Sequence, residues 1–126
     1  MSELPQGFHR VRMELAREKD FPEGSREFGY TFVLPLKEGG KIDPEMWHKH
    51  RDMCRVVKFR PDEKDEVGHL LRRPGGSWAF RYDVDGTNDD EPGYRFGDEN
   101  FMVGEYISVK EDDDMHTFRI ISVEPA

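Results

Sequence analysis

Hydrophobic and polar positions alternate along much of this chain. The longest alternation places apolar residues at the even positions from Phe28 to Leu36, and a shorter one places them at the odd positions from Val11 to Leu15. Successive side chains of a strand point to opposite faces of the sheet, so this alternation is typical of half-buried β-strands. The pattern predicts strands over residues 8–17 and 28–36.

A third alternation, over residues 103–124, predicts a β-hairpin. Apolar residues stand at odd positions before the acidic run 111–114 and at even positions after it. They are Val103, Ile107, Val109, Phe118 and Ile120. These residues share one face only if the loop between the strands has an even number of residues, and aspartate suits such a tight turn. We expect a turn centred on Asp113-Asp114, with Ile107 opposite Ile120 and Val109 opposite Phe118.

A second hairpin is predicted around Pro74-Gly75-Gly76, where proline followed by glycine favours a type II turn. The strands then cover residues 67–73 and 77–84, and Arg73 pairs with Gly76. This register places six residues on one face of the hairpin, which we expect to point inward. They are Val67, His69, Leu71, Trp78, Phe80 and Tyr82.

A short helix is predicted near residues 44–53. Asp43 is a good N-cap, Pro44 suits the first helical position, and Glu45 complements the helix dipole. A short strand over 55–60 should follow, whereas residues 85–92 have the composition of a polar loop. Residues 94–96 fit either a short strand or a lid.

These elements predict an all-β fold. Seven or eight closely spaced strands and one short helix indicate a mainly antiparallel single domain over residues 1–126. A small closed β-barrel is the preferred architecture because closure removes exposed sheet edges. A strongly curved open sheet, with the helix against one side, remains the alternative.

Composition narrows the class of protein. The chain is 35% hydrophobic and 37% charged, yet it has nine Phe, four Tyr and two Trp, which indicates a folded chain with an aromatic core. Its net charge of −8 disfavours nucleic-acid binding through a broad basic surface, and docking on anionic membranes. There is no signal-peptide pattern and no apolar run of membrane-spanning length, so we expect a cytoplasmic protein.

A ligand pocket is predicted inside the barrel. His69 is the one residue that titrates near neutral pH on the expected inward face of Trp78, Phe80 and Tyr82, and Glu105 is the corresponding charge on the C-terminal hairpin. A buried acid and base are typical of functional sites. The alternatives are a hydrogen-bonded core histidine and a glutamate that blocks edge pairing.

The segment 46–54 is richest in metal-ligating side chains. His50 and Cys54 are four residues apart and would share a helix face, whereas His48 and His50 would not. A third ligand would have to come from another histidine. Two ligands fall short of a structural zinc site, so packing of this segment on the sheet is the simpler interpretation. We predict no cofactor.

Two other features resemble binding sites only in part. Residues 83–91 are acidic, but their spacing departs from that of an EF-hand loop, and a solvated turn explains them. Several basic residues near aromatics offer a local face for single-stranded nucleic acid, although the net charge disfavours it. They are Arg55, Lys58, Arg60, Arg72, Arg73 and Arg81.

A protein interface is predicted on the second face of the C-terminal hairpin. Met102, Tyr106, Ile121 and Val123 lie opposite the expected core face and would form an apolar patch, which often marks an interface. Self-association as a homodimer is one interpretation, and coverage by another segment is the other.

The sequence leaves the function open between two classes. The first is a cytoplasmic binding module for a protein partner or a small ligand. The second is a small, metal-dependent or metal-free enzyme that uses His69 and Glu105 as acid and base. A filled interior would favour the first class.

Overall fold

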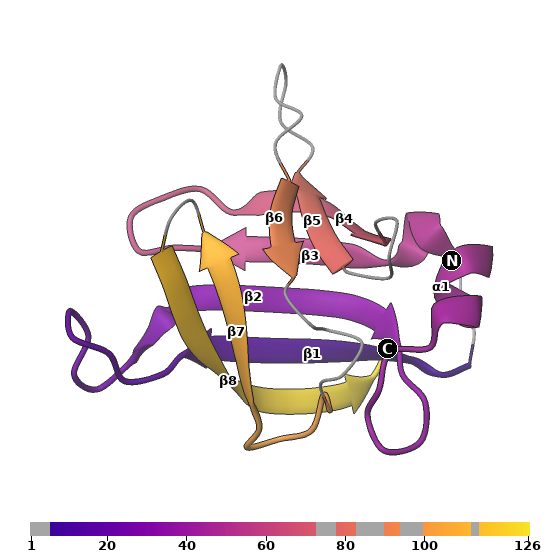
Figure 1. Ribbon diagram of the computed structural model, residues 1–126, viewed down its shortest axis with the longest axis horizontal. Helices are drawn as coiled ribbons and strands as arrows, with labels where there is room; N and C mark the ends of the chain where they lie inside the picture. Colours follow the sequence, from indigo (N-terminus) through magenta and orange to yellow (C-terminus); the bar gives the residue numbers. More distant parts are fainter. Residues whose placement is uncertain (1–5, 73–77, 83–89, 94–99, 112–113) are drawn as a thin grey trace.

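The computed structural model describes residues 6–72, 78–82, 90–93, 100–111 and 114–126. Its strands form one antiparallel sheet that curls into a half-barrel (Figure 1). The mainly antiparallel all-β fold is therefore confirmed, and its form is the strongly curved sheet. The predicted turn Pro74-Gly75-Gly76 and the predicted element at 94–96 lie outside the described residues, as does most of the acidic segment 83–91.

In the described part of the chain, eight strands make up the sheet, in the order β6-β5-β4-β3-β2-β1-β8-β7. Strands β6 and β7 end this order but lie close to each other, because the sheet curls back on itself. The predicted polar loop 85–92 is wrong at its end, which belongs to β6. The strands are β1 (Phe8–Leu15), β2 (Ser25–Pro35), β3 (Arg55–Phe59), β4 (Glu66–Arg72), β5 (Trp78–Tyr82), β6 (Asp90–Gly93), β7 (Tyr106–Glu111) and β8 (Asp114–Pro125).

The core fills the concave side of the sheet with aromatic and aliphatic side chains. Tyr30 and Phe32 of β2 are fully buried and stack with their ring centroids 5.9 Å apart. Phe80 of β5 lies 5.4 Å from the Tyr30 ring and 5.3 Å from the Phe32 ring. The alternation of the sequence thus becomes an interior that is packed at close van der Waals contact.

The loop of the C-terminal hairpin has an even number of residues, as the sequence predicts. Ile107 pairs with Phe118 and Glu111 with Asp114, so two residues connect β7 to β8. The pairing differs by two residues from the predicted one, and a shift of two keeps every side chain on its predicted face. Val103 is the exception, because it precedes β7 and is 63% exposed rather than part of the core.

The β4–β5 register differs from the prediction by one residue. Leu70 pairs with Phe80 and His69 with Arg81, so an odd number of residues connects the strands. Leu70 is 1% exposed, whereas Leu71 is half-buried on the opposite face. A shift of one residue reverses the face of each β4 side chain. The predicted inward position of His69 is therefore wrong.

A β-bulge in β8 divides the predicted interface residues. Arg12 of β1 pairs with Ser122 but Met13 pairs with Ile120, which leaves Ile121 as the extra residue. Ile121 is 41% exposed, whereas Val123 packs partly against the core instead of lying next to Ile121. A bulge re-aims the side chains that follow it, and no alternation in the sequence announces this one.

The helix α1 (Pro44–Lys49) lies at one end of the half-barrel (Figure 1). The Asp43 carboxylate accepts hydrogen bonds from the amides of Glu45 and Met46, at 3.1 and 3.2 Å, as the N-cap prediction requires. The α-helix ends before residue 53, and a 3₁₀ turn η1 (Arg51–Met53) follows it. Trp47 anchors the helix, because its indole nitrogen donates to the Leu70 carbonyl oxygen at 2.8 Å.

Candidate binding grooves

An apolar groove of about 570 Å³ lies between the loop 37–41 and residues 101–103, beside the C-terminal end of β8. We call it the Met102 groove. Its apolar lining comes from Leu36, Phe101, Met102, Val103 and Val123, and its polar rim comes from His9, Lys37 and Glu38. Figure 1 shows the loop 37–41 next to the C-terminus of the chain.

Backbone hydrogen bonds hold the walls of the Met102 groove. The Lys37 amide donates to the Lys41 carbonyl oxygen at 2.7 Å, and the Phe101 amide donates to the Gly40 carbonyl oxygen at 2.7 Å. Gly40 has a φ of +89°, and a Cβ there would lie 3.0 Å from both the Phe101 nitrogen and the Met102 Cγ. Glycine at this position allows the two walls to approach, so the groove is preformed.

The Met102 groove carries the most exposed large hydrophobic side chain in the described part of the chain. Val103 is 63% exposed and Met102 is 50% exposed, whereas Phe101 between the groove and the core is 1% exposed. A partner that covers large apolar side chains of this kind gains free energy, because their apolar surface is removed from water.

A second groove, of about 700 Å³, lies along β1, β8 and the start of β2. We call it the Tyr106 groove. Tyr106 is 56% exposed at its rim, and the bulged Ile121 is its other exposed apolar residue. The two grooves divide the predicted interface, because Met102 and Val123 line the first and Tyr106 and Ile121 the second.

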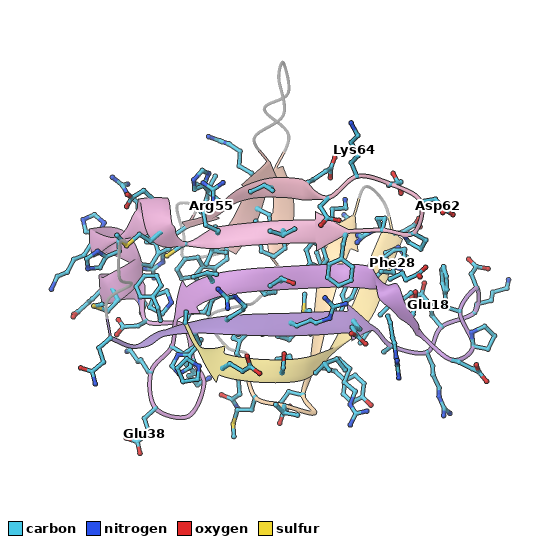
Figure 2. The ribbon with its side chains drawn as sticks, turned by 180° about the vertical axis from the view of Figure 1, so that it is seen from behind. Glu18, Phe28, Glu38, Arg55, Asp62 and Lys64 are labelled. Carbon is cyan, nitrogen blue, oxygen red and sulfur yellow. The ribbon has the colours of Figure 1, made fainter. Side chains whose placement is uncertain are left out.

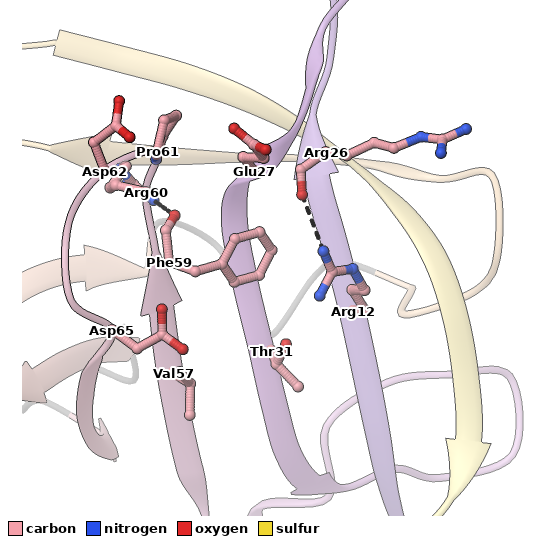
Figure 3. A pocket seen from close by; sticks show the side chains of 10 residues that line it. All are labelled: Arg12, Arg26, Glu27, Thr31, Val57, Phe59, Arg60, Pro61, Asp62 and Asp65. Carbon is pink, nitrogen blue, oxygen red and sulfur yellow. Dashed lines mark hydrogen bonds between the residues drawn. The ribbon is translucent and has the colours of Figure 1, made fainter.

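A third depression, of about 570 Å³, lies on the convex face of the sheet (Figure 3). The Arg12 guanidinium carbon lies 4.3 Å above the centre of the Phe59 ring. Its Nε donates to Glu14 at 2.8 Å and its Nη2 to the Arg26 carbonyl oxygen at 3.0 Å. These contacts already engage Arg12. Figure 2 shows this face, with Arg55 on the neighbouring strand β3.

His69 lies on the convex face rather than in a pocket with Phe80. The Arg55 Nη1 lies 2.5 Å from its Nε2, within hydrogen-bonding distance. Trp78 and Phe80 are core residues, at 2% and 0% exposure. The predicted pocket therefore does not form around His69 with these two aromatic residues.

The remaining predicted pocket residues are Tyr82 and Glu105. The Tyr82 backbone pairs with Gly68 at the end of β5, and its side chain lies outside the described residues. Glu105 is exposed, and its carbonyl oxygen accepts from the Ile120 amide at 2.9 Å. A ligand role for Tyr82 or Glu105 stays a prediction.

The predicted metal ligands His50 and Cys54 are neighbours, but the thiol is engaged. Cys54 is fully buried and its Sγ donates to the His50 carbonyl oxygen at 3.5 Å. Burial raises the pKa of the Cys54 thiol to about 12, and the negative charge of Asp52 adds to this. Metal binding needs the thiolate. Among the described residues, no three His, Cys, Asp or Glu side chains are grouped to hold a metal ion.

Cys54 is expected to resist alkylation by iodoacetamide at neutral pH while the chain is folded, because the thiolate is the reactive form. Unfolding in urea should return its pKa toward 9.0 and speed the reaction. Since the folded pKa is the higher one, burial of the thiol contributes stability below pH 9, and this contribution is lost as the pH rises toward 12. Mass spectrometry measures the labelling, and rapid labelling of the folded chain would contradict this prediction.

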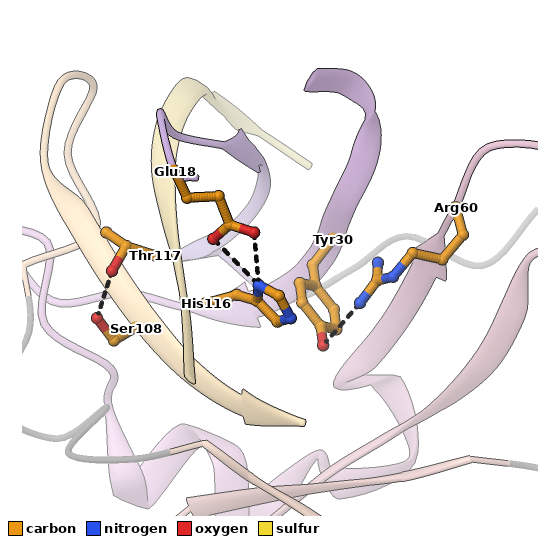
Figure 4. Close-up of polar contacts among 6 residues, drawn as sticks. All are labelled: Glu18, Tyr30, Arg60, Ser108, His116 and Thr117. Atoms are coloured by element: carbon orange, nitrogen blue, oxygen red, sulfur yellow. Dashed lines mark hydrogen bonds and ion pairs between the residues drawn. The ribbon is translucent and has the colours of Figure 1, made fainter. Parts of the chain in front are cut away.

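Sequence reasoning missed the hydrogen-bonded pair of Glu18 and His116 (Figure 4). Glu18 lies at the opposite end of the half-barrel from α1 (Figure 2). The His116 Nδ1 hydrogen-bonds both carboxylate oxygens of Glu18, at 3.0 and 3.1 Å. His116 has the same even parity as the apolar residues Phe118 and Ile120 of β8. This parity could have marked it as inward-facing. Glu18 lies in the β1–β2 loop, 98 residues away, and no local pattern connects the two.

The Glu18–His116 pair has a geometry with two uses. A carboxylate on Nδ1 fixes the orientation of an imidazole, as in acid–base dyads, and it also fastens the β1–β2 loop to β8. Phe28 lies between His116, at 5.4 Å, and the Arg60 guanidinium, at 3.8 Å. Arg60 also donates to the Tyr30 hydroxyl at 3.4 Å. His116 and Arg60 thus contact aromatic residues of the core or next to it. This setting favours the fastening role of the Glu18–His116 pair over an acid–base role.

Comparison with protein-family models, curated proteins and solved structures gave no match. Within the described part of the chain, no helix is long and apolar enough to cross a membrane. The function is therefore inferred from the grooves and the residues around them.

Proposed function

We propose that this chain is a protein-binding module that receives apolar side chains of a partner segment in the Met102 groove. One observation carries the proposal: Met102 and Val103 are highly exposed beside a preformed apolar groove, on a half-barrel whose concave side is packed. The proposed setting is the cytoplasm, where the lone Cys54 stays a thiol.

The volume of the Met102 groove and the net charge of the chain indicate the chemistry of the partner. A groove of about 570 Å³ accommodates one or two large apolar side chains. The net charge of −8 attracts positively charged molecules at long range. The partner proposed here is an extended protein segment that combines aliphatic or aromatic side chains with lysine or arginine.

The walls of the groove support binding at low cost in entropy. The loop 37–41 is closed by its own backbone hydrogen bonds and by a bridge between Leu36 and Ile42. A wall that is already ordered loses little conformational freedom when a segment binds. The exposed Met102 side chain is flexible and adapts to different apolar surfaces.

The test uses a fluorescent peptide of alternating leucine and lysine, titrated with the protein and followed by anisotropy. We expect saturable binding that Met102→Ser and Val103→Ser each weaken by about tenfold, as for central interface residues. Met115→Ser is the matched control, because Met115 is also 50% exposed but lies on β8 outside the groove.

A second peptide, with serine in place of each leucine, separates apolar recognition from charge attraction and should not bind. The proposal fails if the leucine peptide does not bind saturably. It also fails if Met102→Ser and Met115→Ser weaken binding equally, because the groove would then have no special role.

A further inference from the structure

We propose that two copies of this chain associate about a two-fold axis through the Tyr106 groove. This inference goes beyond the proposed function and rests on different residues. A two-fold interface brings the same patch of both copies together, so that patch must be complementary to itself in shape and in charge.

The shape of the patch meets the first requirement. Tyr106 projects at the rim with 56% of its surface exposed. Small residues form part of the groove beside it, including Ala16, Gly24 and Thr117. An exposed tyrosine next to a groove lined by small residues allows each copy to place its ring in the groove of the other. Tyrosine is also enriched among the residues that dominate interface energies.

The charges of the patch meet the second requirement. Arg17, Arg26 and Arg119 line the groove together with Glu14 and Glu23. Glu14 already accepts from Arg12, whereas Glu23 supplies a negative charge that a two-fold axis can set against an arginine of the other copy. The chain as a whole has a net charge of −8, so two copies repel each other over most of their surface. The lining of this groove has no excess of acidic residues, so two copies meet here with less repulsion than they would over the acidic remainder of the surface.

The bulge in β8 adds an apolar residue to the same patch. Arg119 pairs with Tyr106 on one side and with Glu14 on the other, so these three residues form a row across β7, β8 and β1. Ile121 follows Arg119 by two positions, so it lies on the same outward face, and it is 41% exposed. An exposed isoleucine at this place is covered when a second copy docks.

Sedimentation velocity over a concentration series tests this proposal on the full chain. The unmodified protein should show a concentration-dependent dimer, and Tyr106→Ser and Ile121→Ser should each raise the dissociation constant by about tenfold. Met115→Ser and Val67→Ser are the controls, because both residues are exposed and neither lines this groove. Circular dichroism confirms that each variant is folded.

Charge reversal gives a second readout. Arg119→Glu should weaken the dimer at low salt, and high salt should reduce the difference between this variant and the unmodified protein, because exposed charge interactions are screened. A protein that stays monomeric at every concentration overturns the proposal, as does a dimer that the Tyr106 and Ile121 variants leave intact. Met102→Ser should leave the dimer unchanged, so failure here is distinguishable from failure of peptide binding.

Discussion

Replacing Leu70 with alanine is expected to lower the free energy of unfolding by about 2–5 kcal/mol, the usual cost of a cavity at a packed leucine. Leu70 is 1% exposed and lies opposite Phe80 in the β4–β5 ladder. The same change at the adjacent Leu71, on the convex face, should cost about 1 kcal/mol or less. Urea unfolding followed by circular dichroism measures both values.

This pair of leucines decides the register of the β4–β5 hairpin. The register predicted from the sequence would place Leu71 in the core and Leu70 outside it. A larger loss for Leu71→Ala than for Leu70→Ala would support that register and contradict the structure. The comparison is well matched, because the two variants remove the same atoms from neighbouring positions of one strand.

Gly29→Ala is expected to destabilise the chain by about 3 kcal/mol, toward the upper end of the usual cost of overpacking. A Cβ on Gly29 would lie 2.1 Å from the Met13 carbonyl oxygen and 2.8 Å from the Phe59 ring. The contact with Met13 involves the backbone of the neighbouring strand, so the β1–β2 ladder must separate to relieve it. Thermal unfolding and urea unfolding both measure the effect.

Thr31→Ala is the control for Gly29→Ala. Thr31 lies two residues further along β2 and shares its face, but it already carries a Cβ. We expect a loss of about 0.5 kcal/mol, as for a substitution that creates no steric conflict. Equal losses for the two variants would show that the close approach at Gly29 has no energetic consequence.

The sequence predicts those parts of the fold in which local patterns agree. The alternation through Phe32 establishes β2, and Asp43 caps α1 as expected. The odd-to-even change around the acidic run settles the parity of the β7–β8 hairpin, because only one choice buries Ile107 together with Phe118. In each case, the burial of apolar side chains and the local turn or capping residues favour the same structure.

The sequence does not decide between two registers where both faces carry apolar residues. In β4, Leu70 and Leu71 are adjacent and Gly68 has no side chain, so either face can appear to be the core. The side chains of β5 that pack on Tyr30 and Phe32 settle the choice, and that contact is between distant parts of the chain. The pocket prediction for His69 failed for this reason.

The candidate sites were predicted only in part. Met102 and Tyr106 are exposed, and their role in an interface stays a prediction. Their separation into two grooves depends on the bulge at Ile121, which comes from pairing with β1 and not from any local signal. The approach of the loop 37–41 to Phe101 is equally remote in sequence, so the Met102 groove could not be predicted.

The central claim is that the interior of the half-barrel is packed and that binding occurs at the Met102 groove. Amide-resolved NMR during titration with the leucine–lysine peptide tests it most directly. We predict saturable shifts confined to the amides around Gly39, Gly40 and 101–103, with the signals of Leu70 and Phe80 unchanged. Shifts centred on Leu70 and Phe80, or no saturable shift at the groove, would contradict the claim.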